Sequence, residues 1–183
     1  MKKSALIILA EGFEEIETVT PIDILRRCGV RVVVAGLNSI VVKGARDMLL
    51  QAECLLKDVK EEFDLLILPG GSNGATNLKK SEKVMELINV YFKNNKLIGA
   101  ICASPAVVLG NLAFMEGRNA TCFPGCEEYF SSRVIYKKED VVEDGNIISS
   151  RGPGTAFKFS LVLAARLVGE EIANKIGRGT LYL

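Results

Sequence analysis

Residues 97–109 read Leu-Ile-Gly-Ala-Ile-Cys-Ala-Ser-Pro-Ala-Val-Val-Leu. One apolar run leads into Cys102 and a second follows Pro105, which predicts a buried strand, an abrupt turn and a helix. Ser104 and Pro105 are the residue types preferred at a helix N-cap and at the first helical position. Small residues surround the turn, so the backbone can fold closely past the Cys102 side chain. This pattern predicts a nucleophile elbow with cysteine as the nucleophile.

The predicted elbow places the Cys102 thiol at a helix N-terminus. Free backbone N–H groups and the helix dipole stabilise a thiolate there, so we expect a lowered pKa and an ionised sulfur at neutral pH. The alternative is a buried cysteine that acts only as a small hydrophobe, the commonest role of a free cysteine. The small neighbours of Cys102 favour the reactive interpretation. We expect the other four cysteines to be ordinary thiols: Cys28, Cys54, Cys122 and Cys126.

Length and charge suggest one soluble domain over residues 1–183. The chain has 23 basic and 22 acidic residues, a balance that does not favour binding to nucleic acid or to an anionic membrane. Its basic and apolar start is similar to a signal peptide, but acidic residues follow a short apolar run at once. We therefore interpret residues 4–10 as the first strand of a cytoplasmic protein, and no apolar run is long enough to span a bilayer.

The chain contains no histidine, which excludes Cys–His and Ser–His catalysis and every histidine-based metal site. Cys122 and Cys126 form a C-x3-C pair without a second pair, so we expect no zinc site. We also expect no cofactor. An activated thiol in this chain needs help from a carboxyl group, a backbone dipole or an arginine.

Strand-like and helix-like segments alternate along the chain. Strands are predicted over residues 4–10, 30–37, 64–68 and 119–123, and a further strand runs from residue 97 to the elbow. Helices are predicted over residues 14–27, 81–94 and 170–176, and another runs from the turn at 151–155 to residue 167. Hairpins are predicted over residues 41–50 and 141–149. This order predicts an α/β fold with a mainly parallel sheet and helices on both faces. Such sheets carry their sites at the carboxyl ends of strands, where residues 11–17, residues 70–74 and Cys102 would meet.

The glycine-rich segment of residues 70–74 matches neither the dinucleotide fingerprint nor the P-loop pattern. Its backbone N–H groups could contact a reacting atom beside Cys102, and an ordinary glycine turn is equally compatible with the sequence. Arg27, Arg46 and Arg151 lie next to predicted turns, where they are either solvated surface residues or part of an anion-binding rim.

Three acidic residues open the helix predicted over residues 14–27: Glu14, Glu15 and Glu17. For Glu14 and Glu15, compensation of the helix dipole is a sufficient explanation. Glu17 should point in another direction from its acidic neighbours. If it faces the elbow, its pKa is raised, and its protonated carboxyl donates a hydrogen bond to the sulfur.

Four ordered segments together resemble the ThiJ/PfpI superfamily, in the branch of the DJ-one and YajL proteins. They are Ala-Glu-Gly-Phe-Glu-Glu-Ile-Glu-Thr, Leu-Pro-Gly-Gly, Gly-Ala-Ile-Cys-Ala-Ser-Pro and Ser-Arg-Gly-Pro-Gly-Thr-Ala-Phe, and they cover nearly the whole chain. The resemblance implies a flavodoxin-like three-layer α/β sandwich and a homodimer. It also implies site roles: Cys102 as the oxidation-sensitive nucleophile, Glu17 as its hydrogen-bond partner, the amides of Gly71 and Ala103 as oxyanion contacts, and Arg27 and Arg46 in a basic rim near the dimer interface.

One position departs from the human member of this branch, which carries a histidine where this chain has Phe123. A histidine-dependent step is therefore excluded. The predicted activity is a cofactor-independent glyoxalase or protein deglycase that acts on methylglyoxal-type 2-oxoaldehydes and early glycation adducts. The alternative is a redox sensor or chaperone in which Cys102 is oxidised to sulfenate or sulfinate. Because the helix over residues 14–27 carries several apolar residues, we expect it at a two-fold interface.

Overall fold

A seven-stranded sheet forms the centre of the computed structural model, which describes residues 2–183. Its strand order is β10-β11-β7-β6-β1-β2-β5, and every neighbouring pair is parallel except β10 and β11. These strands are β1 (Ser4–Leu9), β2 (Arg31–Gly36), β5 (Cys54–Leu55), β6 (Leu65–Leu68), β7 (Leu97–Ile101), β10 (Val141–Asp144) and β11 (Ile147–Ser150). Two small two-stranded sheets flank it: β3 (Val41–Lys43) with β4 (Leu49–Gln51), and β8 (Asn119–Ala120) with β9 (Ile135–Tyr136).

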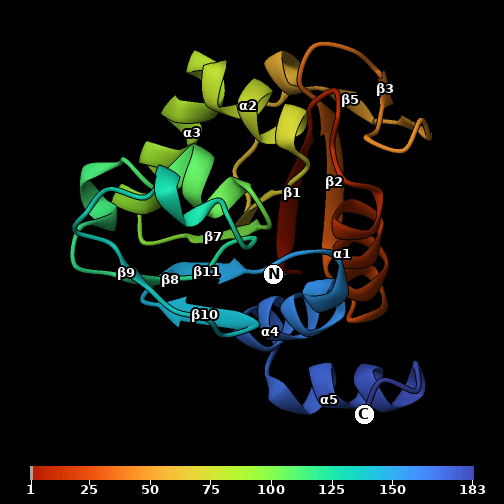
Figure 1. Cartoon of the computed structure of the whole chain (residues 1–183). Coiled ribbons are helices and arrows are strands. Elements are labelled where there is room, and N and C mark those ends of the chain that lie inside the picture. The colour runs from red at the N-terminus through yellow and green to blue at the C-terminus, as the bar shows by residue number, and fades with distance from the viewer. Residues whose placement is uncertain (1) are drawn as a thin grey trace.

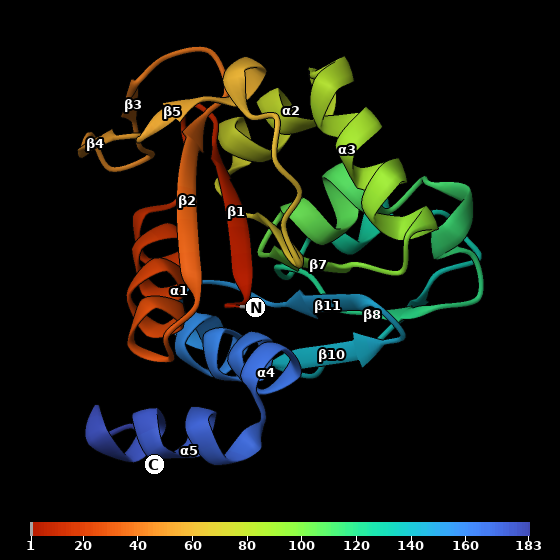
Figure 2. The ribbon, with the colours of Figure 1, turned by 180° about the vertical axis from the view of Figure 1, so that it is seen from behind.

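Helices cover both faces of the sheet (Figures 1 and 2). One face carries α1 (Glu15–Arg27) and α4 (Ala156–Val168), with α5 (Glu170–Gly179) packed on α4; the other carries α2 (Ser72–Lys80) and α3 (Glu82–Lys93). Side chains along β1 alternate between the two cores, with Ile7 and Leu9 in one and Leu6 and Ile8 in the other. A strand buried on both faces is continuously apolar, as the sequence indicated. The predicted flavodoxin-like three-layer sandwich is confirmed.

The structure differs from the prediction on both sides of the elbow. The glycine-rich segment continues directly into α2, a helix that the sequence pattern did not predict. After Cys102 the chain forms only a five-residue π-helix, Pro105–Leu109, in place of a regular α-helix. Ser104 is helical itself and does not cap this segment; its hydroxyl donates to the Pro69 carbonyl. The predicted N-cap was therefore wrong, because a tertiary acceptor competes for the hydroxyl.

The remaining predicted elements are present with shifted ends. Both predicted hairpins form antiparallel pairs, β3 with β4 and β10 with β11. The strand predicted over residues 119–123 is shortened to β8. Pro21 lies inside α1, which is assigned as one helix from Glu15 to Arg27. Over residues 2–183, each helix is too short or too polar to cross a membrane.

Candidate active site

Three loops that follow neighbouring parallel strands meet at one edge of the sheet. The turn after β1 leads into α1, which carries Glu17; the loop after β6 contains Gly70 and Gly71; and Cys102 directly follows β7. Since β1, β6 and β7 are adjacent and parallel, their carboxyl ends lie side by side. The expected meeting of these segments is therefore present.

Cys102 lies in a left-handed backbone conformation between β7 and the π-helix. Its φ is 65°, which is uncommon for a residue other than glycine and costs free energy. Two backbone hydrogen bonds hold it there: its N–H donates to Ser150 at 2.9 Å, and its carbonyl accepts from the Phe123 N–H at 2.8 Å. The predicted elbow is present, and the Cys102 side chain is 8% exposed.

Gly70 separates the Cys102 side chain from the Glu17 carboxyl. A Cβ added at Gly70 would lie 2.4 Å from both the Cys102 Cβ and the Glu17 Oε2. Only glycine therefore leaves room for the thiol and the carboxyl to face each other. The Gly70 N–H also donates to Glu17 Oε2 at 3.0 Å, which fixes the orientation of this fully buried carboxyl.

Burial raises the pKa of Glu17 to about 8, because a carboxylate inside the protein loses its hydration. The Cys102 thiol and the Gly70 N–H stabilise the anion and oppose this shift, while the nearby Glu14 carboxylate adds to it. The predicted direction is confirmed, although the main cause is burial rather than a proton shared with an anionic sulfur. The second oxygen, Oε1, is buried and has no hydrogen-bond partner within residues 2–183.

The pKa of the Cys102 thiol is raised, so the prediction of a lowered pKa was wrong in direction. Burial is the main cause and the charge of Glu17 the second; the N–H groups of Gly71 and Ala103 act in the opposite direction. A single turn of π-helix offers little dipole, and the tertiary packing around Cys102 could not be seen in the local sequence. Burial also raises the pKa of each of the other four thiols: Cys28, Cys54, Cys122 and Cys126.

The amides of Gly71 and Ala103 contact the thiol from two different loops. Gly71 has a φ of 85°, and a Cβ there would lie 2.2 Å from the Gly12 carbonyl oxygen. No residue with a side chain fits this backbone, which turns the Gly71 N–H toward the sulfur. Two N–H groups that converge on one atom can stabilise a developing negative charge.

The two arginines of the expected basic rim do not meet within one chain. Arg27 lies at the end of α1, exposed, and forms an ion pair with Asp23 at 2.7 Å. Arg46 lies beside the start of α1, where its backbone N–H donates to Glu15 Oε1 at 2.6 Å and its guanidinium bonds the Ala45 carbonyl. The full length of α1 separates them, so a shared rim stays a prediction that requires a second copy of the chain.

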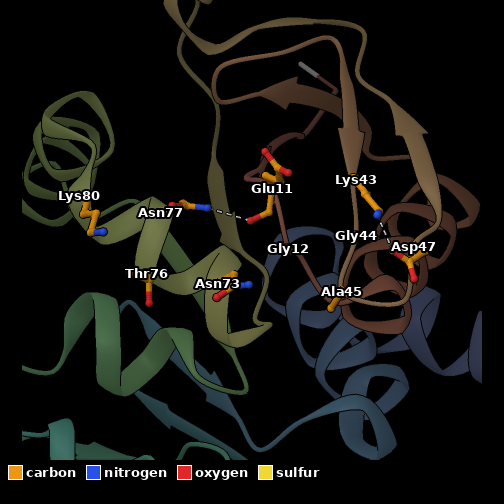
Figure 3. A pocket seen from close by; sticks show the side chains of 10 residues that line it. All are labelled: Glu11, Gly12, Lys43, Gly44, Ala45, Asp47, Asn73, Thr76, Asn77 and Lys80. Atoms are coloured by element: carbon orange, nitrogen blue, oxygen red, sulfur yellow. Dashed lines mark hydrogen bonds and ion pairs between the residues drawn. The ribbon is translucent and has the colours of Figure 1, made fainter.

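A polar hollow of about 440 Å³ lies beside the same edge of the sheet (Figure 3). Cys102 and Glu17 are not part of its lining. Its charged residues balance, and Lys43 and Asp47 pair at 2.6 Å. We therefore do not assign it to the chemistry of the thiol. Within residues 2–183, no three Cys, Asp or Glu side chains gather closely enough to hold a metal ion.

Two features of the site were missed in the sequence. Gly70 was noted only as part of a glycine-rich turn, because local sequence does not show which atoms approach a glycine. Phe123 was noted only for its identity, whereas its ring packs on Gly152 beside the Glu17 carboxyl, 3.1 Å from where a Gly152 Cβ would lie. The local signal of this contact in the sequence is the pair of glycines that follows Arg151, Gly152 and Gly154.

Comparison with known proteins places the chain among well-defined relatives. The family model described as "DJ-1/PfpI family" matches residues 3–166. Protein DJ-1 homolog A of Arabidopsis thaliana is 42% identical over 178 residues, which are 96% of this chain and 45% of that protein. This chain thus spans about half the length of the plant relative.

Animal relatives match over nearly their whole length. The glutathione-independent glyoxalase DJR-1.2 of Caenorhabditis elegans is 38% identical, over 96% of this chain and 94% of its own. The crystal structure of Drosophila melanogaster DJ-1beta superimposes with a TM-score of 0.95 at 39% identity and covers 100% of both chains.

Proposed function

Because the chain belongs to the DJ-1/PfpI family, we propose that it is a glutathione-independent glyoxalase. Its substrates are small 2-oxoaldehydes such as methylglyoxal, its products are 2-hydroxy acids, and the reaction requires no cofactor. The observation that supports this proposal most is the pairing of the Cys102 thiol with the buried Glu17 carboxyl across Gly70. The activity named for the nematode relative supports the same class of reaction.

The first step is addition of the sulfur to the aldehyde carbon. The active form of the pair carries one proton: Glu17 as carboxylate takes the thiol proton, and the resulting thiolate attacks. The aldehyde oxygen becomes negative and is stabilised by the N–H groups of Gly71 and Ala103. Glu17 then returns the proton to this oxygen, which gives a hemithioacetal.

The second step moves a hydrogen within the intermediate. The Glu17 carboxylate takes the proton from the carbon bonded to sulfur while the neighbouring carbonyl oxygen is protonated, which gives an enediol. Glu17 then delivers its proton to the former carbonyl carbon, and the hydroxyl on the carbon bonded to sulfur loses its proton and becomes the thioester carbonyl. The product is a thioester of the 2-hydroxy acid on Cys102. Water hydrolyses this thioester, which releases the acid and restores the thiol. The overall reaction adds one water and requires no oxidant or reductant.

Early adducts of a 2-oxoaldehyde with protein side chains are a related substrate. In such an adduct the Cys102 sulfur displaces the side-chain nitrogen or sulfur, which leaves with the proton that Glu17 took from the thiol. The resulting hemithioacetal then rearranges as above, and the release of the side chain would register as protein deglycase activity. Removal of the free aldehyde also lowers the amount of adduct. Deglycase and glyoxalase activity are therefore distinguished by whether the adduct or the free aldehyde disappears first.

A redox-sensing role is the second candidate. It is favoured by the unpartnered Oε1 of Glu17, a buried polar atom whose hydrogen bond an added oxygen on the sulfur could supply. The raised pKa of the Cys102 thiol counts against it, since peroxides react with the thiolate. A stable mass gain at Cys102 after mild peroxide treatment, without methylglyoxal turnover, would favour this role over the enzyme.

The test of the leading proposal is lactate formation from methylglyoxal by purified, metal-free protein. Cys102→Ser and Glu17→Gln should each reduce kcat/KM by roughly 10²–10⁴-fold, because one removes the nucleophile and the other the proton carrier. Cys54→Ser, a half-buried thiol on β5, is the matched control and should retain activity. Near-normal turnover by either site variant would contradict the mechanism.

A further inference from the structure

Arg151 has an unsatisfied donor next to the candidate active site. It directly follows β11, whose last residue, Ser150, accepts the Cys102 N–H. The Arg151 Nε atom is buried and has no hydrogen-bond partner. Within residues 2–183, the Arg151 guanidinium forms no ion pair and no hydrogen bond. Buried donors without partners are rare and cost free energy, so this one calls for an explanation.

Arg151 lines a small pocket of about 220 Å³, whose lining includes neither Cys102 nor Glu17 but does include Gly152, next to the Glu17 carboxyl. The walls are otherwise apolar or backbone: the Phe123 ring, Pro124, Pro153 and two glycines. Thr155, the other polar lining residue, uses its hydroxyl to accept the Gly152 N–H and is not free for a ligand. Arg151 is therefore the one charged residue of a lining that is otherwise apolar or backbone.

The groups around the guanidinium do not neutralise it. Burial raises the pKa of Cys122 to about 12 and also raises that of Tyr136, so both are uncharged at neutral pH despite the nearby Arg151. Glu127 is the anion on the adjoining loop, but it forms no ion pair with Arg151 and accepts a hydrogen bond from the Gly125 N–H. The positive charge at this position thus has room for an external anion.

The pocket adjoins the reacting groups across Gly152. A Cβ at Gly152 would lie 3.1 Å from the Phe123 ring and 3.8 Å from Glu17 Oε1, so this glycine of the pocket wall lies between the ring and the carboxyl.

We propose that Arg151 and the Phe123–Pro153 wall form a binding subsite for a small 2-hydroxy carboxylate. An arginine fork matches a carboxylate in a bidentate pair, and the aromatic wall suits a short alkyl group. The volume limits the ligand to a few carbon atoms. The identification of this acid as the product rests on the function proposed above, whereas the recognition of a small carboxylate rests on the pocket alone.

The experiment measures binding in the Cys102→Ser protein, which cannot turn over. Lactate is titrated and its methyl signal is followed by saturation-transfer NMR, with the uncharged amide lactamide as the matched ligand. Lactate should bind and lactamide should bind at least about tenfold more weakly, because the charge-assisted pair is lost. Adding Arg151→Gln should weaken lactate binding by a similar factor. Arg151→Lys, which retains the charge but not the fork, should lie between.

Arg133→Gln, an exposed arginine paired with Glu116, is the control and should leave lactate binding unchanged. Equal binding of lactate and lactamide, or lactate binding that survives both Arg151 substitutions, would overturn the subsite. The proposed function can fail separately. If the parent protein forms no lactate from methylglyoxal while Cys102→Ser still binds lactate through Arg151, the subsite stands and the glyoxalase does not.

Discussion

At the scale of single residues, the Glu17–Cys102 pair predicts how activity depends on pH. Burial raises the pKa of Glu17 to about 8, so the carboxylate that accepts the thiol proton becomes abundant only above that pH. We expect kcat/KM for methylglyoxal to increase with pH through an apparent pKa near 8. Initial rates between pH 6 and pH 9.5 check this. A profile that is flat over this range, or one with its midpoint near pH 5, would show that Glu17 is not the base.

The same residue predicts a dependence of stability on pH. The folded state holds the Glu17 proton more tightly than the unfolded chain, so the stabilisation from this group is complete below its ordinary pKa of 4.5 and is lost as pH rises through about 8. Glu17→Gln removes the titration. At pH 9 we expect the free energy of unfolding of the variant to exceed that of the parent by about 1–4 kcal/mol. Between pH 5 and pH 9 the free energy of unfolding should also decrease less in the variant than in the parent.

Urea denaturation of both proteins at a series of pH values measures this difference. Glu127→Gln, at an exposed acidic residue, is the control and should follow the parent curve. Parallel curves for the parent and Glu17→Gln would mean that the Glu17 carboxyl is not held protonated in the folded protein.

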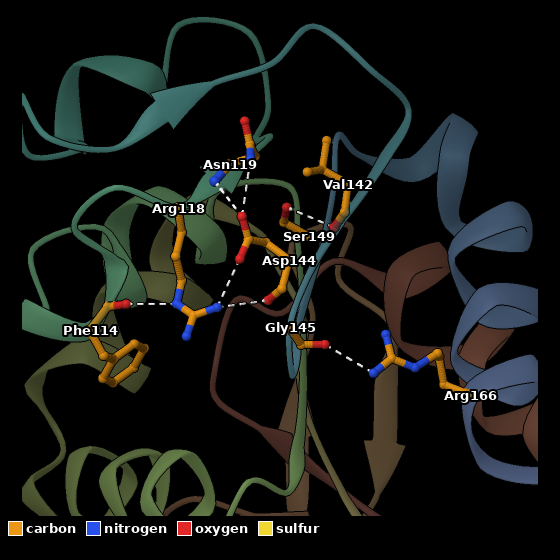
Figure 4. Close-up of polar contacts among 8 residues, drawn as sticks. All are labelled: Phe114, Arg118, Asn119, Val142, Asp144, Gly145, Ser149 and Arg166. Atoms are coloured by element: carbon orange, nitrogen blue, oxygen red, sulfur yellow. Dashed lines mark hydrogen bonds and ion pairs between the residues drawn. The ribbon is translucent and has the colours of Figure 1, made fainter.

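At the scale of secondary-structure elements, the Asp144 carboxylate ties β8 to the β10–β11 hairpin (Figure 4). It accepts hydrogen bonds from Arg118 Nη1 at 2.8 Å and from the Asn119 N–H and side-chain amide at 2.9 and 3.0 Å. The segment it holds continues to Phe123, whose N–H bonds Cys102. This cluster therefore helps to position Phe123, and through it the backbone of Cys102, from a distance.

Asp144→Ala should lower the free energy of unfolding by about 2–3 kcal/mol, since it leaves the Asn119 N–H and side-chain amide without their acceptor and Arg118 without its anion, although Arg118 keeps the carbonyls of Phe114 and residue 144. Asp140→Ala is the matched control, because its pair with Lys158 is half exposed and should contribute less than about 1 kcal/mol. Urea denaturation at pH 7 compares the two. Equal losses would show that the Asp144 cluster is no more important than a surface ion pair.

Local sequence predicts an element when its determinants are local. The hairpin over residues 141–149 was predicted from Asp144-Gly145, and Gly145 has the positive φ of 62° that such a turn requires. The whole of α2 was missed, because its beginning, Gly71-Ser72-Asn73-Gly74, has the composition of a loop. In the fold, Gly74 packs closely on the backbone of Phe13, a contact between distant segments that composition does not reveal.

The candidate site shows the same division. The position of Cys102 followed from its small neighbours, and the approach of Glu17 followed from strand order together with the family resemblance. The raised pKa of Cys102 could not be predicted from the sequence, because desolvation of the thiol depends on all the side chains that the fold brings around it. The separation of Arg27 from Arg46 is likewise a matter of tertiary placement.

At the scale of the whole molecule, α1 and the neighbouring hairpin carry exposed apolar side chains that no other part of residues 2–183 covers. They are Ile16 and Val19 on α1 and Val41, Met48 and Leu49 on the β3–β4 hairpin, each 46–68% exposed. The β3–β4 hairpin is held beside the beginning of α1, since the Ala45 N–H donates at 2.8 Å to the carbonyl of Phe13, which lies just before the helix. The opposite side of α1 packs on α4. An exposed cluster of this kind is typical of a protein interface and favours the predicted homodimer.

Val19→Glu tests the dimer. In a two-fold interface the same surface meets itself, so one substitution introduces two like charges that must be buried close together. We expect the parent to be a dimer at micromolar concentration and Val19→Glu to be largely a monomer, as measured by light scattering coupled to size exclusion. Val90→Glu on α3 is the matched control, because Val19 and Val90 are both 46% exposed and lie on different faces. A monomeric parent, or dissociation by Val90→Glu to the same extent, would exclude α1 as the specific interface.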